Sequence, residues 1–287
     1  MDRDNPELGQ GFAPSSQRDV WPHIRHQSRQ QLKGLADGLE RRAAWPEQRR
    51  VREAWLDQIG IRAGQRVLEV GCGTGALARA AAARVAPGGE VVGIDPSPIL
   101  LERARQLATE ANLHGTLAFQ EGTAEHTGVP AGSYDAVLAI TVFSHLPRPA
   151  EALRGMIRAT APGGLVSVFD QDYYTLQFDH PDEATTARVV WANAAGVVDG
   201  AAGRKLARWL AEAGLEQIGV QAWAYTEYGR PRYLLGLAER GTAWAVDRGD
   251  LTAKAANTWL AELRAMGEAG RYFGTLMYIA AWGRVAS

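Results

Sequence analysis

The chain has 287 residues, 46% of them hydrophobic, and a formal net charge of −1 at pH 7. Such a composition can bury a full core, and it excludes wholesale disorder and a general electrostatic attraction to nucleic acid or an anionic membrane. The single cysteine, Cys72, excludes an intramolecular disulfide and a cysteine-cluster metal site. No apolar run reaches the roughly 18 residues of a spanning helix, and the amino end lacks a basic-then-apolar leader, so we expect a cytoplasmic protein. Frequent alanine, arginine and glycine are typical of a GC-rich bacterial genome.

The first 60 residues are predicted to lie outside the sheet. Residues 1–18 are polar and contain Pro and Gly, which indicates an arm. Apolar spacing predicts one helix over 20–39 and a second over 41–59, interrupted near Pro46.

From residue 61 onward, short apolar runs alternate with helical patterns of 10–15 residues, which predicts a mainly parallel α/β sheet covered on both faces. The expected strands are 67–70, 90–94, 116–120, 134–140 and 165–169, with helices at 75–85, 98–111 and 149–160. The last third is less regular, with helices around 189–195, 203–213, 231–246 and 252–268 and strands at 217–228 and 273–282. No clear linker separates these parts, so we expect one domain with a helical cap.

A glycine-rich loop joins the first predicted strand to the helix after it. Gly71, Gly73 and Gly75 stand at alternate positions, where missing side chains let a ligand approach the backbone and the helix amino end. Glu69 is a carboxylate in an otherwise apolar strand, and burying it is costly unless something pairs with it. Without Glu69, a tight strand-to-helix turn would be enough to explain the glycines. The spacing of Gly71, Gly73 and Ala76 also fits a dinucleotide-binding fingerprint.

The stretch Glu69-Val-Gly-Cys-Gly-Thr-Gly75 resembles the first motif of class I S-adenosylmethionine (SAM)-dependent methyltransferases. The turn Ala161-Pro-Gly-Gly-Leu165, the extra carboxy-terminal strand and Glu69 favour this family over a dinucleotide-binding protein. The likeness is specific over residues 64–170 and points to the small-molecule branch, akin to ubiquinone/menaquinone-biosynthesis and bacterial secondary-metabolite enzymes. It implies a Rossmann-like seven-stranded sheet with an antiparallel last strand, a SAM-binding domain over 61–287 with cap insertions near 171–201 and 229–269, and lid helices within 1–60.

The resemblance also implies a set of cofactor contacts. Asp95, 24 residues after Gly71, ends the second strand and would accept hydrogen bonds from the ribose hydroxyls, although alone it can also be a helix cap. Thr123 replaces the acid that the family uses near adenine, and Glu125 is the alternative there. The predicted SAM-binding residues are Glu69, Gly71, Cys72, Gly73, Gly75, Asp95, Pro96, Ile99, Thr123, Ala124, Glu125, Ile140 and Thr141.

Candidate catalytic groups follow the fourth and fifth strands. His145 lies beyond the fourth strand and can act as a general base near neutral pH, or only cap and pack. Asp170 and Asp172 follow the fifth strand, where parallel sheets bind ligands, or belong to a solvated loop. The predicted acceptor contacts are Tyr173, Tyr174, Trp191 and Tyr225.

These patterns predict methyl transfer to O, N or C of a small organic acceptor, with S-adenosylhomocysteine as the product. The alternatives are a SAM-binding protein that no longer methylates, such as a cyclase, and a dinucleotide-dependent oxidoreductase. His114, His126 and His180 have no metal partners at ligand spacing, so no metal site is expected. We expect neither a nucleic-acid nor a membrane partner, and a monomer or homodimer.

Overall fold

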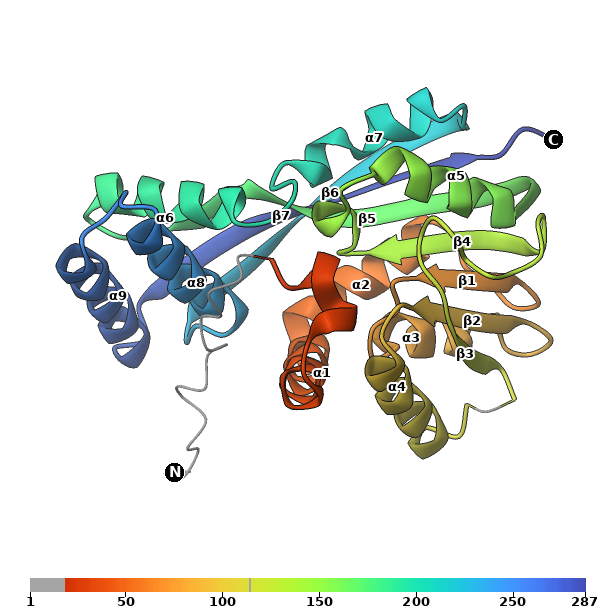
Figure 1. The fold of residues 1–287 in the computed structure, drawn as a ribbon, viewed down its shortest axis with the longest axis horizontal. Coiled ribbons are helices and arrows are strands. Elements are labelled where there is room, and N and C mark those ends of the chain that lie inside the picture. The colour runs from red at the N-terminus through yellow and green to blue at the C-terminus, as the bar shows by residue number, and fades with distance from the viewer. Residues whose placement is uncertain (1–18, 114) are drawn as a thin grey trace. The chain divides into compact units, whose positions relative to one another are not determined.

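A computed structural model of the chain describes residues 19–113 and 115–287, so the arm predicted at 1–18 and His114 lie outside the described residues. Its centre is a seven-stranded sheet with the order β3-β2-β1-β4-β5-β7-β6 (Figure 1). The pairs β1–β2, β1–β4, β2–β3 and β4–β5 are all parallel. The predicted α/β fold with a Rossmann-like, mainly parallel sheet is therefore confirmed. The strands are β1 Arg66–Val70, β2 Glu90–Asp95, β3 Leu117–Glu121, β4 Tyr134–Ile140, β5 Thr160–Phe178, β6 Glu216–Gly229 and β7 Tyr272–Arg284.

The described chain forms two compact units. The larger unit comprises Asp19–Asp172, Val198–Tyr225 and Met277–Ser287, and the smaller one includes Tyr173–Val197 and Thr226–Leu276. Residues 19–60 thus group with the strands that carry the predicted SAM site. The smaller unit takes up most of the two segments predicted as cap insertions.

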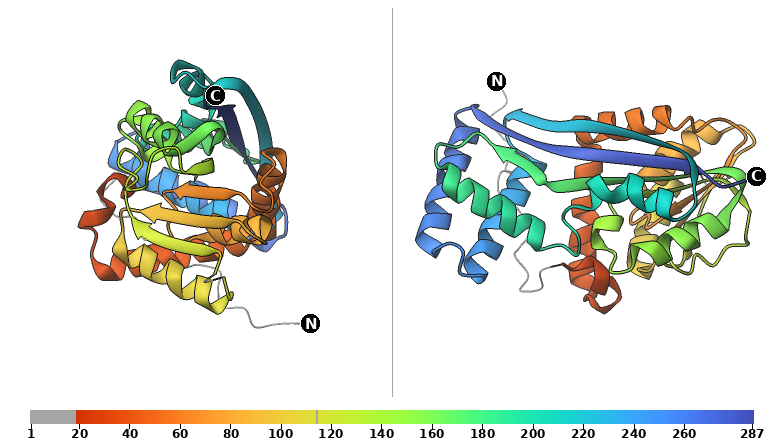
Figure 2. Two further views of the ribbon diagram at one scale, coloured as in Figure 1. Left: turned by 90° about the vertical axis from the view of Figure 1, so that its right-hand side faces the viewer. Right: turned by 90° about the horizontal axis from the view of Figure 1, so that it is seen from above.

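In the larger unit, helices lie on both faces of the sheet (Figure 2, left). Helix α2 packs on α3, and α5 packs on α7 on the other face. Branched and aromatic side chains fill the space between the helices and the strands. Leu68, Val137 and Phe143 are among them, and all three are fully buried. The helices of this unit are α1 Arg29–Ala44, α2 Pro46–Gln58, α3 Ala76–Val85, α4 Pro98–Glu110, α5 Pro149–Ala159 and α7 Ala202–Glu212, with 3-10 turns η1 Trp21–His26 and η2 Phe143–His145.

The amino-terminal helices differ from the prediction. The segment expected as one helix over 20–39 is the turn η1 followed by α1, and α1 continues to Ala44. Ser28 begins α1 through a capping box with Gln31, because each residue's side chain accepts a hydrogen bond from the other's backbone. The predicted interruption near Pro46 is confirmed: α1 ends at Ala44, and Pro46 occupies the first turn of α2, where its missing N–H costs nothing.

Strand β5 is much longer than predicted, running over Thr160–Phe178 rather than 165–169. Its polar residues at 170–172 suggested a loop, yet all three are buried in the strand. Helices α6 Glu183–Ala195, α8 Tyr233–Asp247 and α9 Ala253–Glu268 pack on one another in the smaller unit. Trp259 lies in that helical packing, with its ring against Phe178.

Candidate functional site

The glycine loop adopts a backbone that other residues rarely take. Gly71, Gly73 and Gly75 have φ angles of 71°, 53° and 77°, all in the left-handed region. A Cβ atom on Gly71 would lie 2.6 Å from Cγ2 of Val142. The N–H groups of Gly71 and Cys72 both donate to the carbonyl of Ile94, at 2.8 and 2.9 Å, and so tie the loop to β2. The glycines therefore allow both the turn and the close contact with the end of β4.

Glu69 is a buried carboxylate with an unpaired oxygen. Glu69 belongs to β1 and is 1% exposed. Its Oε2 has no hydrogen-bond partner among the described residues. Burial raises the pKa of Glu69 to about 8, against the opposing effects of the Ala78 N–H and the Arg79 guanidinium. An orphan acceptor beside the glycine loop fits the ammonium group that the SAM assignment expects there.

Asp95 at the end of β2 holds the glycine loop. Its Oδ2 accepts a hydrogen bond from Gly73 N–H and its Oδ1 accepts one from Ser97 N–H, each at 2.9 Å. Burial raises the pKa of this carboxyl to about 6, although both N–H groups favour the ionised form. Each oxygen has a second lone pair, so these two contacts leave acceptor capacity for two ribose hydroxyls.

The residues predicted near adenine already have protein contacts. Ile99 packs against the cluster that α1 forms with α4, which contains Leu32 and Leu35. The Thr123 hydroxyl accepts a hydrogen bond from His126 N–H at 3.2 Å, which closes the turn after β3. Ala124 is buried, and the Glu125 carboxylate lies 3.9 Å from Arg148. Adenine recognition through the Thr123 hydroxyl stays a prediction, since this oxygen also stabilises its own turn.

The residue that follows β4 has an unusual backbone conformation. Thr141 follows Ile140 with a φ of 52°, a strained conformation for a β-branched residue. The Thr141 N–H donates to the Phe169 carbonyl at 2.7 Å, which fixes this conformation against β5.

The amino-terminal segment 19–44 contacts the loops after β1, β2 and β4, and its role as a lid stays a prediction. Arg25 Nε donates to the Pro96 carbonyl at 3.2 Å, and Arg42 Nη2 donates to Thr141 Oγ1 at 3.3 Å. A Cβ on Gly73 would lie 3.2 Å from Cδ1 of Leu39. All of these loops stand at the carboxyl end of the parallel strands, where such sheets bind ligands.

His145 forms a buried pair that the sequence did not reveal. Its Nδ1 lies 2.8 Å from Asp19 Oδ2, and each side chain is 10% exposed. The Trp21 ring lies against the imidazole, with ring centroids 6.0 Å apart. Asp19 is 126 positions away in the chain, and no local pattern marks it as a partner.

Asp170 is fully buried and contacts the loop that carries His145. Its carboxylate accepts hydrogen bonds from Ser144 N–H at 2.9 Å and from Gln171 N–H at 2.7 Å. Burial raises the pKa of Asp170, and the nearby His145 acts in the opposite direction. The observed contacts fix backbone geometry, and a catalytic role for Asp170 stays a prediction.

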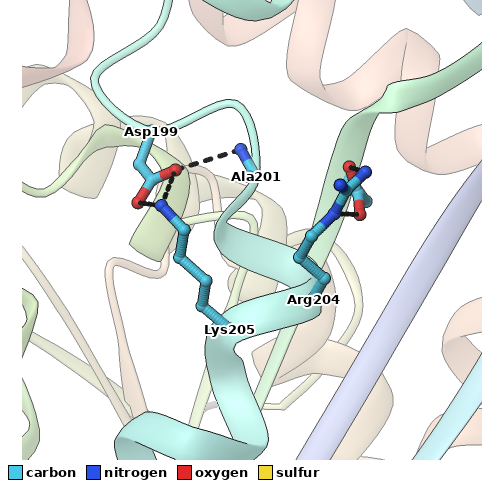
Figure 3. Close-up of polar contacts among 5 residues, drawn as sticks. Asp199, Ala201, Arg204 and Lys205 are labelled. Carbon is cyan, nitrogen blue, oxygen red and sulfur yellow. Dashed lines mark hydrogen bonds and ion pairs between the residues drawn. The ribbon is translucent and has the colours of Figure 1, made fainter.

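Asp172 is paired with Arg204 of α7, which is labelled in Figure 3. The Arg204 guanidinium donates to the Asp172 carboxylate from two of its nitrogens: Nε to Oδ2, and Nη2 to Oδ1 at 2.8 Å. One residue further along α7, Lys205 Nζ contacts both oxygens of Asp199, at 2.8 and 2.6 Å. A carboxylate held by a bidentate guanidinium is a poor proton acceptor, so the geometry favours an anchoring role for Asp172.

The predicted acceptor contacts fall in both units. Tyr173, Tyr174 and Trp191 belong to the smaller unit, where Tyr174 and Trp191 meet edge to face at 5.4 Å. Trp191 is 60% exposed, and the ring of Tyr173 lies under the Arg240 guanidinium. Tyr225 belongs to the larger unit and is fully buried against Tyr278. Their role toward an acceptor stays a prediction.

Residues 19–113 and 115–287 contain no group of three or more His, Cys, Asp or Glu placed to hold a metal ion. Within the same ranges, none of the helices has the length and apolar character needed to cross a membrane.

Comparison with known proteins gives the family of the glycine-loop region. Residues 67–164 match the family model described as a methyltransferase domain. An uncharacterized 37.1 kDa protein in transposon TN4556 of Streptomyces fradiae is 32% identical over 230 residues, which are 79% of this chain and 66% of that protein. The ubiquinone/menaquinone biosynthesis C-methyltransferase UbiE of Ectopseudomonas mendocina is 32% identical over 134 residues, 47% of this chain and 50% of that enzyme. The chain therefore spans between half and two thirds of the length of these two relatives.

Solved structures show the same fold. The YcgJ protein of Bacillus subtilis aligns with a TM-score of 0.56 and 19% identity, covering 82% of this chain and 98% of that one. The [4+2]-cyclase SpnF aligns with a TM-score of 0.54 and 20% identity, covering 83% of this chain and 82% of that one. At these identities the likeness concerns architecture alone.

Proposed function

We propose that this chain transfers a methyl group from SAM to a small organic acceptor. The reason is that it belongs to the small-molecule branch of the class I SAM-dependent methyltransferases. The acceptor atom is O, N or C, and S-adenosylhomocysteine is the product. We further propose a bacterial secondary metabolite as the acceptor and the cytoplasm as the site of action.

The observation that carries this proposal is the pair of carboxylates at the glycine loop. Glu69 presents an unpaired oxygen and Asp95 presents spare acceptor capacity, and the two flank a loop with three left-handed glycines. An ammonium group and a vicinal diol are the ligand groups that this donor and acceptor set fits. SAM contains both.

When bound, SAM supplies a methyl group on a positively charged sulfonium, and transfer requires the acceptor atom in line with it. The chain's part is to position the acceptor and, where the acceptor carries an O–H or N–H, to remove its proton. Of the predicted catalytic residues, we propose His145 as the base, because Asp170 accepts hydrogen bonds from backbone N–H groups and Asp172 pairs with Arg204. We retain Tyr173, Tyr174, Trp191 and Tyr225 as proposed acceptor contacts.

Isothermal titration of the purified protein with SAM, S-adenosylhomocysteine and NADH tests the cofactor assignment. We expect micromolar binding of the first two and none of NADH. Binding of NADH alone would identify a dinucleotide-dependent enzyme and overturn the proposal.

A second experiment tests the transfer itself. The protein is incubated with SAM carrying a labelled methyl group and with a panel of phenols, amines and enolisable carbonyl compounds, and S-adenosylhomocysteine is measured. Formation of S-adenosylhomocysteine with one acceptor class only supports the proposal and identifies the acceptor atom. SAM binding without S-adenosylhomocysteine from any acceptor would favour a non-methylating SAM protein, such as a cyclase.

A further inference from the structure

The carboxylate of Asp19 has three hydrogen-bond partners that fix its position. Its Oδ1 accepts from Trp21 N–H at 3.2 Å, and its Oδ2 accepts from Val198 N–H at 3.3 Å. The same Oδ2 lies 2.8 Å from Nδ1 of His145. The carboxylate therefore cannot rotate away from the imidazole without losing backbone hydrogen bonds.

This contact decides which imidazole nitrogen carries the proton. An ionised carboxylate only accepts hydrogen bonds, so Nδ1 of His145 must be the donor. In the neutral ring, Nε2 is then the nitrogen with a free lone pair. Asp19 contacts Nδ1 and not Nε2, and the side chain retains 10% exposure. A neutral imidazole held in this tautomer is ready to accept a proton.

The imidazole stands on the loop that contacts the predicted SAM site. His145 closes the turn η2 directly after β4, and Val142 in the same loop contacts the backbone at Gly71. Asp170 holds the intervening Ser144 N–H from below. The ring is thus fixed by Asp19 on one side and by its buried loop on the other.

We propose that Asp19 is a positioning residue for His145, and that the two form a dyad in which Nε2 of His145 removes a proton from the acceptor. This inference rests on the proposed methyl transfer. It also narrows the acceptor to a molecule with an ionisable O–H or N–H. As the acceptor's lone pair forms the new bond to the methyl carbon, the sulfur–methyl bond breaks and sulfur keeps its electron pair. The acceptor's proton passes to Nε2, and the imidazolium, stabilised by Asp19, returns it to solvent.

The tautomer of His145 gives a test that needs no acceptor. In ¹⁵N-labelled protein with SAM bound, long-range ¹H–¹⁵N spectra distinguish Nδ1–H from Nε2–H imidazoles, and comparison with His145→Gln assigns the signal. We expect the Nδ1–H form in the native protein and the Nε2–H form in Asp19→Asn, because an amide can donate to Nδ1. The exposed His126 is the internal reference, and its signal should be the same in both proteins. An Nε2–H imidazole at His145 in the native protein overturns the proposal.

The kinetic test uses the acceptor that the labelled-methyl screen identifies. In Asp19→Asn, kcat should fall about 100-fold or more while KM for the acceptor and the dissociation constant for SAM stay within twofold. Asp135→Asn, which alters a carboxylate that accepts from Arg66 N–H at the other end of β4, should leave kcat unchanged. Loss of SAM affinity in Asp19→Asn matching the loss of kcat shows a structural role and overturns the dyad. Absence of S-adenosylhomocysteine with every acceptor, together with the expected tautomer, overturns the proposed methyl transfer and the base role with it.

Discussion

At the scale of single residues, Asp95 holds the glycine loop, and we propose that it also binds the ribose of SAM. Replacement by alanine would remove the hydrogen bonds to Gly73 and Ser97 as well as the proposed ribose contact, so the milder change is Asp95→Asn, which can still accept one of these two bonds. It keeps one acceptor oxygen and removes the charge. We expect SAM affinity to fall by about 1.5–3 kcal/mol, as for hydrogen bonds to a charged group. Titration calorimetry measures this change.

Asp135→Asn is the matched control for Asp95→Asn, because it alters a carboxylate at the opposite end of the same sheet. Its SAM affinity should equal that of the native protein. Equal affinities for all three proteins would remove Asp95 from the cofactor site.

Glu69 should make SAM binding release a proton. Burial raises its pKa to about 8, so the free protein holds this carboxyl largely protonated at pH 7. An ammonium group beside the carboxylate favours the ionised form, and the proton leaves as SAM binds. Titrations at pH 7 in buffers of different ionisation enthalpy should show a release approaching one proton. The release should vanish in Glu69→Gln, and its persistence there would assign the proton to another group.

The same carboxyl makes the free protein less stable as the pH rises. The folded pKa of Glu69, about 8, lies above its ordinary value of 4.5, so between these values the folded state binds more protons than the unfolded state. The free energy of unfolding therefore declines through this window, by up to on the order of 4 kcal/mol. Glu69→Gln should flatten the decline, which denaturant titrations at pH 5 and pH 8 measure.

Residue by residue, local chemistry was readable and distant partners were not. The glycine positions, the buried acid in the first strand and the acid that ends the second strand follow from spacing and strand ends. Asp19 has no local signal, because its partner is 126 positions away. Thr123 resembles a ligand contact in the sequence, but its hydroxyl also accepts from His126 N–H, a detail of turn geometry.

At the scale of elements, the strand–loop–helix unit depends on glycine at one position more than at another. Gly71→Ala would require φ near 71° with a side chain and would place its Cβ 2.6 Å from Val142. Gly88→Ala would require a similar φ of 82° with no atom within 4 Å of the new Cβ. We expect Gly88→Ala to cost about 1–2 kcal/mol of stability with native SAM affinity.

Gly71→Ala should cost more than Gly88→Ala and weaken SAM binding at least tenfold, because the loop must shift to relieve the clash. Thermal unfolding and SAM titration of the two variants give the comparison. If Gly71→Ala retains native SAM affinity, the loop shape is not what admits the ligand.

Helix α7 offers two ion pairs of different burial for a direct comparison. Arg204 holds Asp172, whose side chain is 2% exposed, whereas the Arg208–Glu212 pair is more than half exposed at both ends. Arg204→Gln removes the cation from a buried carboxylate and should cost about 1–3 kcal/mol. Arg208→Gln should cost less than about 0.5 kcal/mol. Denaturant unfolding of the two variants tests whether the Asp172 pair anchors this helix, and equal costs would rule that out.

The elements themselves were predicted well where the hydrophobic period was clear. Strand β4 was predicted with its observed bounds, and most helices within one or two residues. Strand β5 was cut short because polar residues at 170–172 suggest a loop unless their partners, Ser144 N–H and Arg204, are known. The start of α1 was missed although Ser28 and Gln31 form a recognisable capping-box pattern.

At the scale of the whole molecule, SAM binding should slow backbone hydrogen exchange in segment 19–44 and in the loops that this segment contacts. Segment 19–44 reaches the loops after β1, β2 and β4 through Leu39, Arg25 and Arg42. Hydrogen exchange followed by mass spectrometry should show slower exchange in 19–44 and in 71–76 when SAM or S-adenosylhomocysteine is added. Slower exchange in the loop without any change in 19–44 would show that this segment is no lid.

The division of the chain has a consequence for how the protein can change through descent. The polypeptide passes between the two units at residues 172/173, 197/198, 225/226 and 276/277, and three of these passages lie inside the strands β5, β6 and β7. Within residues 19–287, the smaller unit is therefore built from two separate segments, 173–197 and 226–276. Recombination that exchanged it whole would need several coordinated junctions, three of them inside continuous strands. Substitutions scattered over α6, α8 and α9 need none, so this unit is expected to diversify by point mutation and not by transfer as a cassette.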